Sequence, residues 1–146
     1  MPRMNGGCHC GNIAVEMTLV NMPDSYRPRA CDCDFCRKHG ASYVSDTRGS
    51  LAIRIRDERE SSRYRQGSGS AECLLCRNCG VLVAILYRGD EQLYGAVNAA
   101  ALATPTGFGP EQIVSPRILS ESEKVNRWRD IWFADVQVTH GAHVAI

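Results

Sequence analysis

Eight cysteines, all of them in short clusters, constrain this chain of 146 residues more than any other feature of its sequence. They form three groups, which are Cys8-x-Cys10, Cys31-x-Cys33-x-x-Cys36 and Cys73-x-x-Cys76-x-x-Cys79. The start of the chain has no apolar segment of the secretory type, so we expect a cytoplasmic protein. In a reducing compartment, clustered cysteines favour metal binding or catalysis over disulfides. The cysteine spacing therefore predicts metal sites.

Composition narrows the classes of function. The chain has 17 Lys and Arg against 16 Asp and Glu, a net charge of +1, which gives no basis for a nucleic-acid or anionic-membrane partner. Its longest strongly apolar run, residues 81–87, is far shorter than the roughly 18–20 residues of a membrane helix. A chain of this length can bury a core without disulfides. We expect one domain over residues 1–146, with its core at about residues 6–132.

Apolar periodicity predicts a mostly β fold. Alternating or continuous apolar residues indicate strands over residues 13–19, 51–55, 71–75, 81–87 and 93–97. The charged turn before Arg63-Tyr64-Arg65 predicts that the second of these strands forms a hairpin with that segment. No sequence repeat divides the chain.

A short C-terminal helix is predicted after Ser120. Ser120-Glu121-Ser122-Glu123 has the spacing of a capping box, in which the serine and the glutamate each satisfy a backbone amide. Val125, Trp128 and Trp132 then recur at helical spacing, which is typical of core packing. We expect His140 and His143 to lie in a frayed tail without a role.

The first and last cysteine groups can complete one metal site together. Cys8 and Cys10 offer two thiolates on the same face of an extended segment. A tetrahedral zinc needs two more ligands, and Cys76 and Cys79 are the natural complement, with Gly80 supplying a permissive backbone. The spacing predicts a closed structural zinc site that contributes directly to folding.

The middle group leaves two interpretations open. Cys31, Cys33 and Cys36 supply three thiolates, and three protein ligands leave one position for water or substrate, as in a catalytic zinc. Alternatively, Cys73 completes a second closed site, and the spacing does not choose between the two. An iron–sulfur cluster is disfavoured because Val83 and Ala84 stand where the ferredoxin pattern requires its fourth cysteine and its proline.

As a set, the cysteine motifs resemble a known family. Gly7-Cys8-His9-Cys10-Gly11, Cys31-x-Cys33-x-x-Cys36-Arg37 and Cys76-x-x-Cys79-Gly80, in this order and spacing, resemble the glutathione-dependent formaldehyde-activating enzyme family. The resemblance implies a single-domain β-tent zinc fold with two zinc ions per chain. It implies a structural zinc on Cys8, Cys10, Cys76 and Cys79 and a catalytic zinc on Cys31, Cys33 and Cys36.

The resemblance also implies a reaction. It is the condensation of formaldehyde with glutathione to S-(hydroxymethyl)glutathione, which makes the protein a carbon–sulfur lyase with a small thiol and a small aldehyde as its partners. The chain departs from the family in carrying Asp32 and Asp34 inside its middle motif and in having Cys73, which has no counterpart. The added negative charge should make the metal less electrophilic.

Basic residues beside the middle motif are candidates for substrate binding. Arg37 and Lys38 can stabilise an alkoxide or pair with the carboxylates of glutathione, or they can simply balance Asp32 and Asp34 at the surface. His39 can act as a proton shuttle, whereas His9 should point away from the metal of its neighbours. A noncatalytic zinc-binding module and an iron–sulfur or redox protein are the alternatives to a lyase.

Overall fold

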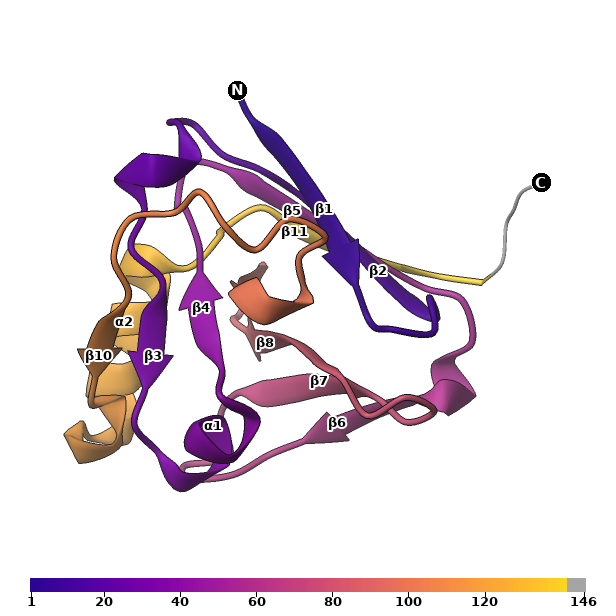
Figure 1. The fold of residues 1–146 in the computed structure, drawn as a ribbon. Coiled ribbons are helices and arrows are strands. Elements are labelled where there is room, and N and C mark those ends of the chain that lie inside the picture. Colours follow the sequence, from indigo (N-terminus) through magenta and orange to yellow (C-terminus); the bar gives the residue numbers. More distant parts are fainter. Residues whose placement is uncertain (142–146) are drawn as a thin grey trace.

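Two β-sheets carry the fold, as the computed structural model of the protein shows for residues 1–141 (Figure 1). The expected tail residue His143 lies outside the described residues. The smaller sheet has the strand order β1 (Arg3–Gly7), β2 (Ile13–Thr18), β5 (Ser50–Ile55) and β11 (Val136–His140). The larger sheet has the order β10 (Gln112–Val114), β3 (Arg29–Cys31), β4 (Ser42–Val44), β9 (Leu93–Asn98), β8 (Leu82–Arg88), β7 (Glu72–Cys76) and β6 (Ser61–Tyr64). The mostly β prediction is confirmed.

Two α-helices accompany the sheets. Helix α1 (Asp34–His39) begins at Cys33 and ends at Gly40, whose left-handed backbone lets its N–H bond the carbonyls of Arg37 and Cys36. Helix α2 (Glu121–Ile131) begins with the predicted capping box, in which Ser120 and Glu123 bond each other's backbone amides. Short 3-10 turns span Pro23–Ser25, Glu58–Glu60, Ala99–Ala101 and Pro116–Ile118. In the described part of the chain, no helix is both long and apolar enough to cross a bilayer.

The larger sheet is buried on both faces because consecutive side chains of a strand point in opposite directions. In β8, Ala84 and Leu86 pack into a cluster shared with the smaller sheet. Ile85 and Tyr87 of the same strand pack on the other side, in a cluster with Trp128 and Trp132 from the region of α2. The molecule therefore has two apolar layers, one between the sheets and one between the larger sheet and α2.

Two sequence expectations were wrong about which strands become neighbours. Residues 51–55 and 63–65 do not form a hairpin, because β5 pairs with β2 and β11 whereas β6 pairs with β7 in the other sheet. The 3-10 turn at Glu58–Glu60 carries the chain between the sheets. His140 does not lie in a frayed tail, because it closes β11, which pairs in parallel with β5.

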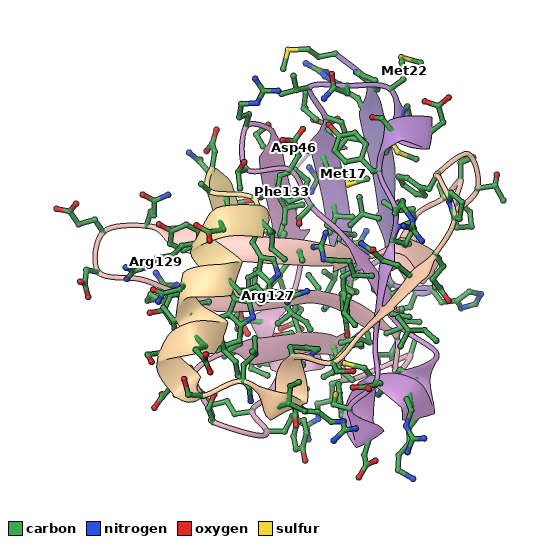
Figure 2. All side chains as sticks on the ribbon, turned by 90° about the vertical axis from the view of Figure 1, so that its left-hand side faces the viewer. Met17, Met22, Asp46, Arg127, Arg129 and Phe133 are labelled. Atoms are coloured by element: carbon green, nitrogen blue, oxygen red, sulfur yellow. The ribbon has the colours of Figure 1, made fainter. Side chains whose placement is uncertain are left out.

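Phe133 joins α2 to both sheets. Its backbone exchanges hydrogen bonds with Gly95 of β9, at 2.9 and 3.1 Å. Its ring is fully buried in the cluster between the sheets, near Met17 of β2 (Figure 2). This aromatic side chain fixes the position of the C-terminal segment against the core.

Replacing Phe133 by Ala should therefore cost about 3–5 kcal/mol of unfolding free energy, because the cavity left in a two-sheet core cannot collapse. Urea denaturation followed by circular dichroism measures the loss. Phe108→Ala is the matched control, since Phe108 is only partly buried against the same cluster and should cost less. Equal losses in the two variants would contradict the role given to Phe133.

Candidate metal centres

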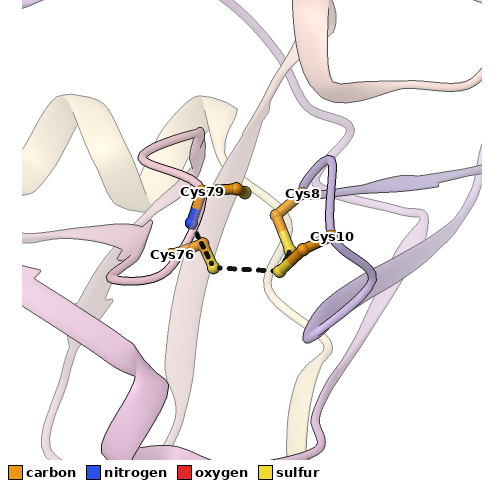
Figure 3. A group of neighbouring side chains, drawn as sticks. All are labelled: Cys8, Cys10, Cys76 and Cys79. Carbon is orange, nitrogen blue, oxygen red and sulfur yellow. Dashed lines mark hydrogen bonds between the residues drawn. The ribbon is translucent and has the colours of Figure 1, made fainter.

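Four cysteines from two turns meet at one point, as Figure 3 shows. Cys8 and Cys10 lie in the turn between β1 and β2, Cys76 is the last residue of β7, and Cys79 lies in the turn that leads to β8. All four sulfurs lie within 4.8 Å of one another. The sulfur of Cys10 is 3.7 Å from that of Cys8 and 3.5 Å from that of Cys76. Chain segments 66 residues apart are thus brought into contact.

Local backbone geometry explains why each turn presents two sulfurs. Gly11 and Gly80 follow the second cysteine of each pair and have positive φ angles of 88° and 83°, which glycine adopts without strain. In each turn a backbone amide donates to a cysteine sulfur. The N–H of Ile13 donates to the sulfur of Cys8 at 3.2 Å, and the N–H of Cys79 donates to the sulfur of Cys76 at 3.4 Å. The permissive backbone expected at Gly80 agrees with its positive φ angle in this turn.

The first cluster suits a tetrahedral thiolate-binding metal. Sulfurs at about 2.3 Å from a tetrahedral zinc lie about 3.8 Å from one another, close to the separations seen here. A hydrogen bond from the side chain of Asn78 is the main reason why the pKa of Cys10 falls to about 6, so this ligand readily loses its proton. The cluster can hold a metal ion, and four thiolates are as many ligands as a tetrahedral ion takes.

The second cluster contains Cys31, Cys33 and Cys36, whose sulfurs also lie within 4.8 Å of one another. Cys31 ends β3, Cys33 caps α1, and Cys36 lies in the first turn of that helix. The sulfur of Cys33 accepts a hydrogen bond from the backbone N–H of Cys36 at 3.4 Å. A strand end joined to a helix start therefore gathers three sulfurs within six residues.

Neighbouring side chains contact this second cluster directly. The hydroxyl of Tyr43 lies 3.3 Å from the sulfur of Cys36, and the amide of Gln66 donates to the sulfur of Cys33 at 3.9 Å. A hydrogen bond with Cys36 lowers the pKa of Cys31 to about 6. Burial raises the pKa of Tyr43, so its hydroxyl keeps its proton and can donate it in a hydrogen bond.

Cys73 lies near the second cluster without joining it. Its sulfur does not belong to the group formed by Cys31, Cys33 and Cys36, although all four residues line one cavity. Burial raises the pKa of Cys73 to about 12, which keeps it a neutral thiol. This arrangement favours three protein ligands and an open fourth position over a second closed site.

A cavity of about 220 Å³ opens beside the three sulfurs. Tyr43, Ile85, Trp128 and Trp132 form its apolar wall, so the tryptophan stripe that the sequence assigns to core packing also faces the cavity. Its charged lining residues are Arg29, Arg117, Lys124 and Arg127, and no acidic residue lines it.

Anchoring contacts hold two of the four cations of the cavity in place. The guanidinium of Arg29 donates to the hydroxyl of Ser45 at 2.6 Å, and that hydroxyl donates to the carbonyl of Ile131 at 2.6 Å. Burial lowers the pKa of Arg29 to about 10, and the charge of Arg127 adds to this shift. Arg117 bonds Asp32 at 3.2 Å, and Ser115 donates to the same carboxylate at 2.6 Å.

The basic residues expected to contact substrate lie outside the cavity. Arg37 forms a surface ion pair with Asp34 at 3.0 Å, and Lys38 is exposed on α1. His39 packs its ring near that of Phe35, and His9 is exposed beside the first cluster. The charges of both aspartates in the middle motif are therefore balanced by arginines.

Arg29, Lys124 and Arg127 are not among the residues expected from the sequence, although two patterns point to them. Arg29 precedes Cys31 by two residues on an extended segment, so both side chains share a face. Lys124 lies three residues before Arg127 and four before Trp128, which places them on one helix face. Tyr43 and Gln66 come from distant segments, and no sequence pattern marks them.

Comparison with known proteins connects the cysteine sites to a family. A family model described as glutathione-dependent formaldehyde-activating enzyme matches residues 3–116, a stretch that includes all eight cysteines. A search of the curated proteins gives no match. Among solved structures, the crystal structure of a Rhodobacter sphaeroides protein matches with a TM-score of 0.52 and 28% sequence identity, over 93% of this chain and 100% of that chain.

Cobalt titration of the metal-free protein should distinguish the ligands. We expect the wild type to bind two Co²⁺ ions per chain with thiolate charge-transfer absorbance, one at each cluster. Cys36→Ala and Cys76→Ala should each lose one ion, because each removes a ligand from a different cluster. Cys73→Ala should keep both ions, and its loss of one would show that Cys73 is a ligand.

Proposed function

This chain belongs to the glutathione-dependent formaldehyde-activating enzyme family, and on that premise we propose that it is a zinc-dependent carbon–sulfur lyase. Its reaction adds a thiol such as glutathione to formaldehyde or a related small aldehyde. The observation that supports this most is the cavity of about 220 Å³ beside Cys31, Cys33 and Cys36, because a noncatalytic zinc site needs no such space.

Each chain would hold two zinc ions with different tasks. Cys8, Cys10, Cys76 and Cys79 would hold a structural ion, since they fill all four tetrahedral positions. Cys31, Cys33 and Cys36 would hold the catalytic ion. Zinc bound there supplies a position at which the substrate thiol loses its proton more easily. Free cysteine ligands suit a cytoplasmic location, where thiols stay reduced.

The reaction forms one carbon–sulfur bond and moves one proton. The sulfur of the substrate attacks the carbonyl carbon of the aldehyde, and the carbonyl oxygen then takes up the proton that the thiol has lost. Lys124 lines the cavity and can stabilise the negative charge that develops on this oxygen. Arg37 and Lys38, exposed on α1 outside the cavity, remain proposed contacts for the distal carboxylates of glutathione.

The protein's own residues prepare the sulfur site. The hydroxyl of Tyr43 lies 3.3 Å from the sulfur of Cys36 and can donate to it, and Gln66 donates to the sulfur of Cys33, so two of the three ligands are oriented by neighbours. Trp128 and Trp132 give the cavity beside the reacting atoms an apolar wall. Cys73 lies outside the group of three sulfurs, so we give it no part in the transfer.

Removing the two metals should have unequal effects on stability. Cys76→Ala should lower the melting temperature much more than Cys36→Ala, because the first cluster connects segments 66 residues apart whereas the second spans six residues. Differential scanning calorimetry of the zinc-loaded variants measures both. A Cys76→Ala protein that melts like the wild type would refute a structural role for that cluster.

Catalysis can be tested by exchange spectroscopy. The zinc-loaded wild type should accelerate the exchange between formaldehyde and its glutathione adduct beyond the spontaneous rate, as magnetisation-transfer NMR at equilibrium would show. Folded Cys36→Ala should lose the acceleration, and Arg129→Gln, an exposed change on α2, should retain it. Two bound zinc ions without acceleration would instead support the noncatalytic zinc module.

A further inference from the structure

Three cations of the cavity have no counterion among the residues that the structure describes. Within residues 1–141, no acidic side chain forms an ion pair with Arg29, Lys124 or Arg127. The fourth cation, Arg117, is neutralised by Asp32. The whole chain has nearly equal numbers of acidic and basic residues. A cavity whose charged lining residues are all basic is therefore a local concentration of positive charge.

Partial burial makes this concentration costly. A charge removed from water loses hydration that only a counterion or hydrogen bonds restore. Arg29 makes one side-chain hydrogen bond, to Ser45, and none is found for Arg127 among the described residues. Since a guanidinium has several N–H donors in a planar fork, Arg29 and Arg127 keep donors that can bond a ligand in the cavity they line.

A metal ion bound by the three thiolates of the second cluster would neutralise only part of the positive charge of the cavity. Three thiolates and a divalent ion at the second cluster would carry one net negative charge, against the three unpaired cations of the cavity. A substrate thiolate and one further anionic group would complete the balance. Planar guanidinium forks match a carboxylate by bidentate hydrogen bonding.

The size and charge of the cavity restrict the ligand further. Its volume of about 220 Å³ is below the roughly 300–1,000 Å³ of pockets that enclose drug-sized ligands. Glutathione is a tripeptide that also carries an ammonium group, for which this cavity offers no acidic partner. A short thiol with a carboxylate and no ammonium group satisfies both limits.

We propose that Arg29 and Arg127 form a carboxylate-binding site in this cavity and that the preferred thiol substrate is a short mercaptocarboxylate. The thiol part rests on the proposed function, whereas the carboxylate site does not. The methylene groups of such a ligand would contact the wall formed by Trp128 and Trp132. The family match ends at residue 116, so Arg127 lies beyond the segment that the family model describes.

Intrinsic fluorescence gives a direct test, because Trp128 and Trp132 are the only tryptophans of the chain and both line the cavity. The zinc-loaded protein is titrated with 3-mercaptopropionate, 2-mercaptoethanol, glutathione and propionate. We expect 3-mercaptopropionate to bind at least about tenfold more tightly than 2-mercaptoethanol and glutathione. Propionate should bind saturably but more weakly, since it has no sulfur.

Variants of Arg127, Arg129 and Arg29 test whether the carboxylate binds in the cavity. Arg127→Gln should weaken the binding of propionate and 3-mercaptopropionate at least about tenfold and leave 2-mercaptoethanol unchanged. Arg129→Gln is the matched control, because Arg127 and Arg129 leave α2 on different sides and Arg129 is exposed (Figure 2). Arg29→Lys, which keeps the charge but loses the planar fork, should weaken both carboxylates less than Arg127→Gln does.

Specific results would overturn the proposal. Binding of glutathione or 2-mercaptoethanol as tight as that of 3-mercaptopropionate would refute the preferred substrate class. Carboxylate affinities within twofold of the wild type in folded Arg127→Gln would refute the binding site. If propionate binds through Arg127 but no thiol reacts with formaldehyde, the lyase proposal fails and the carboxylate site stands. If thiols react with formaldehyde but carboxylate binding does not depend on Arg127, the carboxylate site fails and the lyase proposal stands.

Discussion

The meeting of Cys8, Cys10, Cys76 and Cys79 is the contact that brings a turn of the smaller sheet against a turn of the larger one. One cysteine pair belongs to the smaller sheet and the other to the larger, so a metal ion held by these four sulfurs, which lie within 4.8 Å of one another, would fix the sheets to each other at this corner. The buried ring of Phe133 and its backbone pairing with Gly95 attach the C-terminal segment to the same core at a second point.

Because the larger sheet is buried on both faces, the main apolar core and the candidate site lie on opposite faces of it. Side chains of β8 that point to the smaller sheet form a closed apolar core, whereas those on the other face meet α2, the second cysteine cluster and the cavity. The same helix supplies Trp128 for packing and Arg127 for charge. A site of unbalanced positive charge is therefore built against a rigid sheet without disturbing the main core.

Much of the fold and of the metal sites is predictable from the sequence. The alternation at Ile13, Val15 and Met17 predicts β2, and the capping box predicts the start of α2, because both are short-range patterns. Pairing partners are not predictable in this way. β5 and β6 are neighbours in sequence but lie in different sheets, since periodicity shows which face of a strand is buried and not which strand covers it.

The sequence by itself determined that the candidate metal ligands are thiols and that they occur in local groups. Cysteines two or three residues apart share a strand face or a turn whatever the rest of the fold is. Only the tertiary structure decided that Cys73 stays out of the second cluster and that Arg29 and Arg127, 98 positions apart, line one cavity. The physical reason is distance along the chain: contacts between remote segments depend on sheet order and helix docking, which local patterns do not encode.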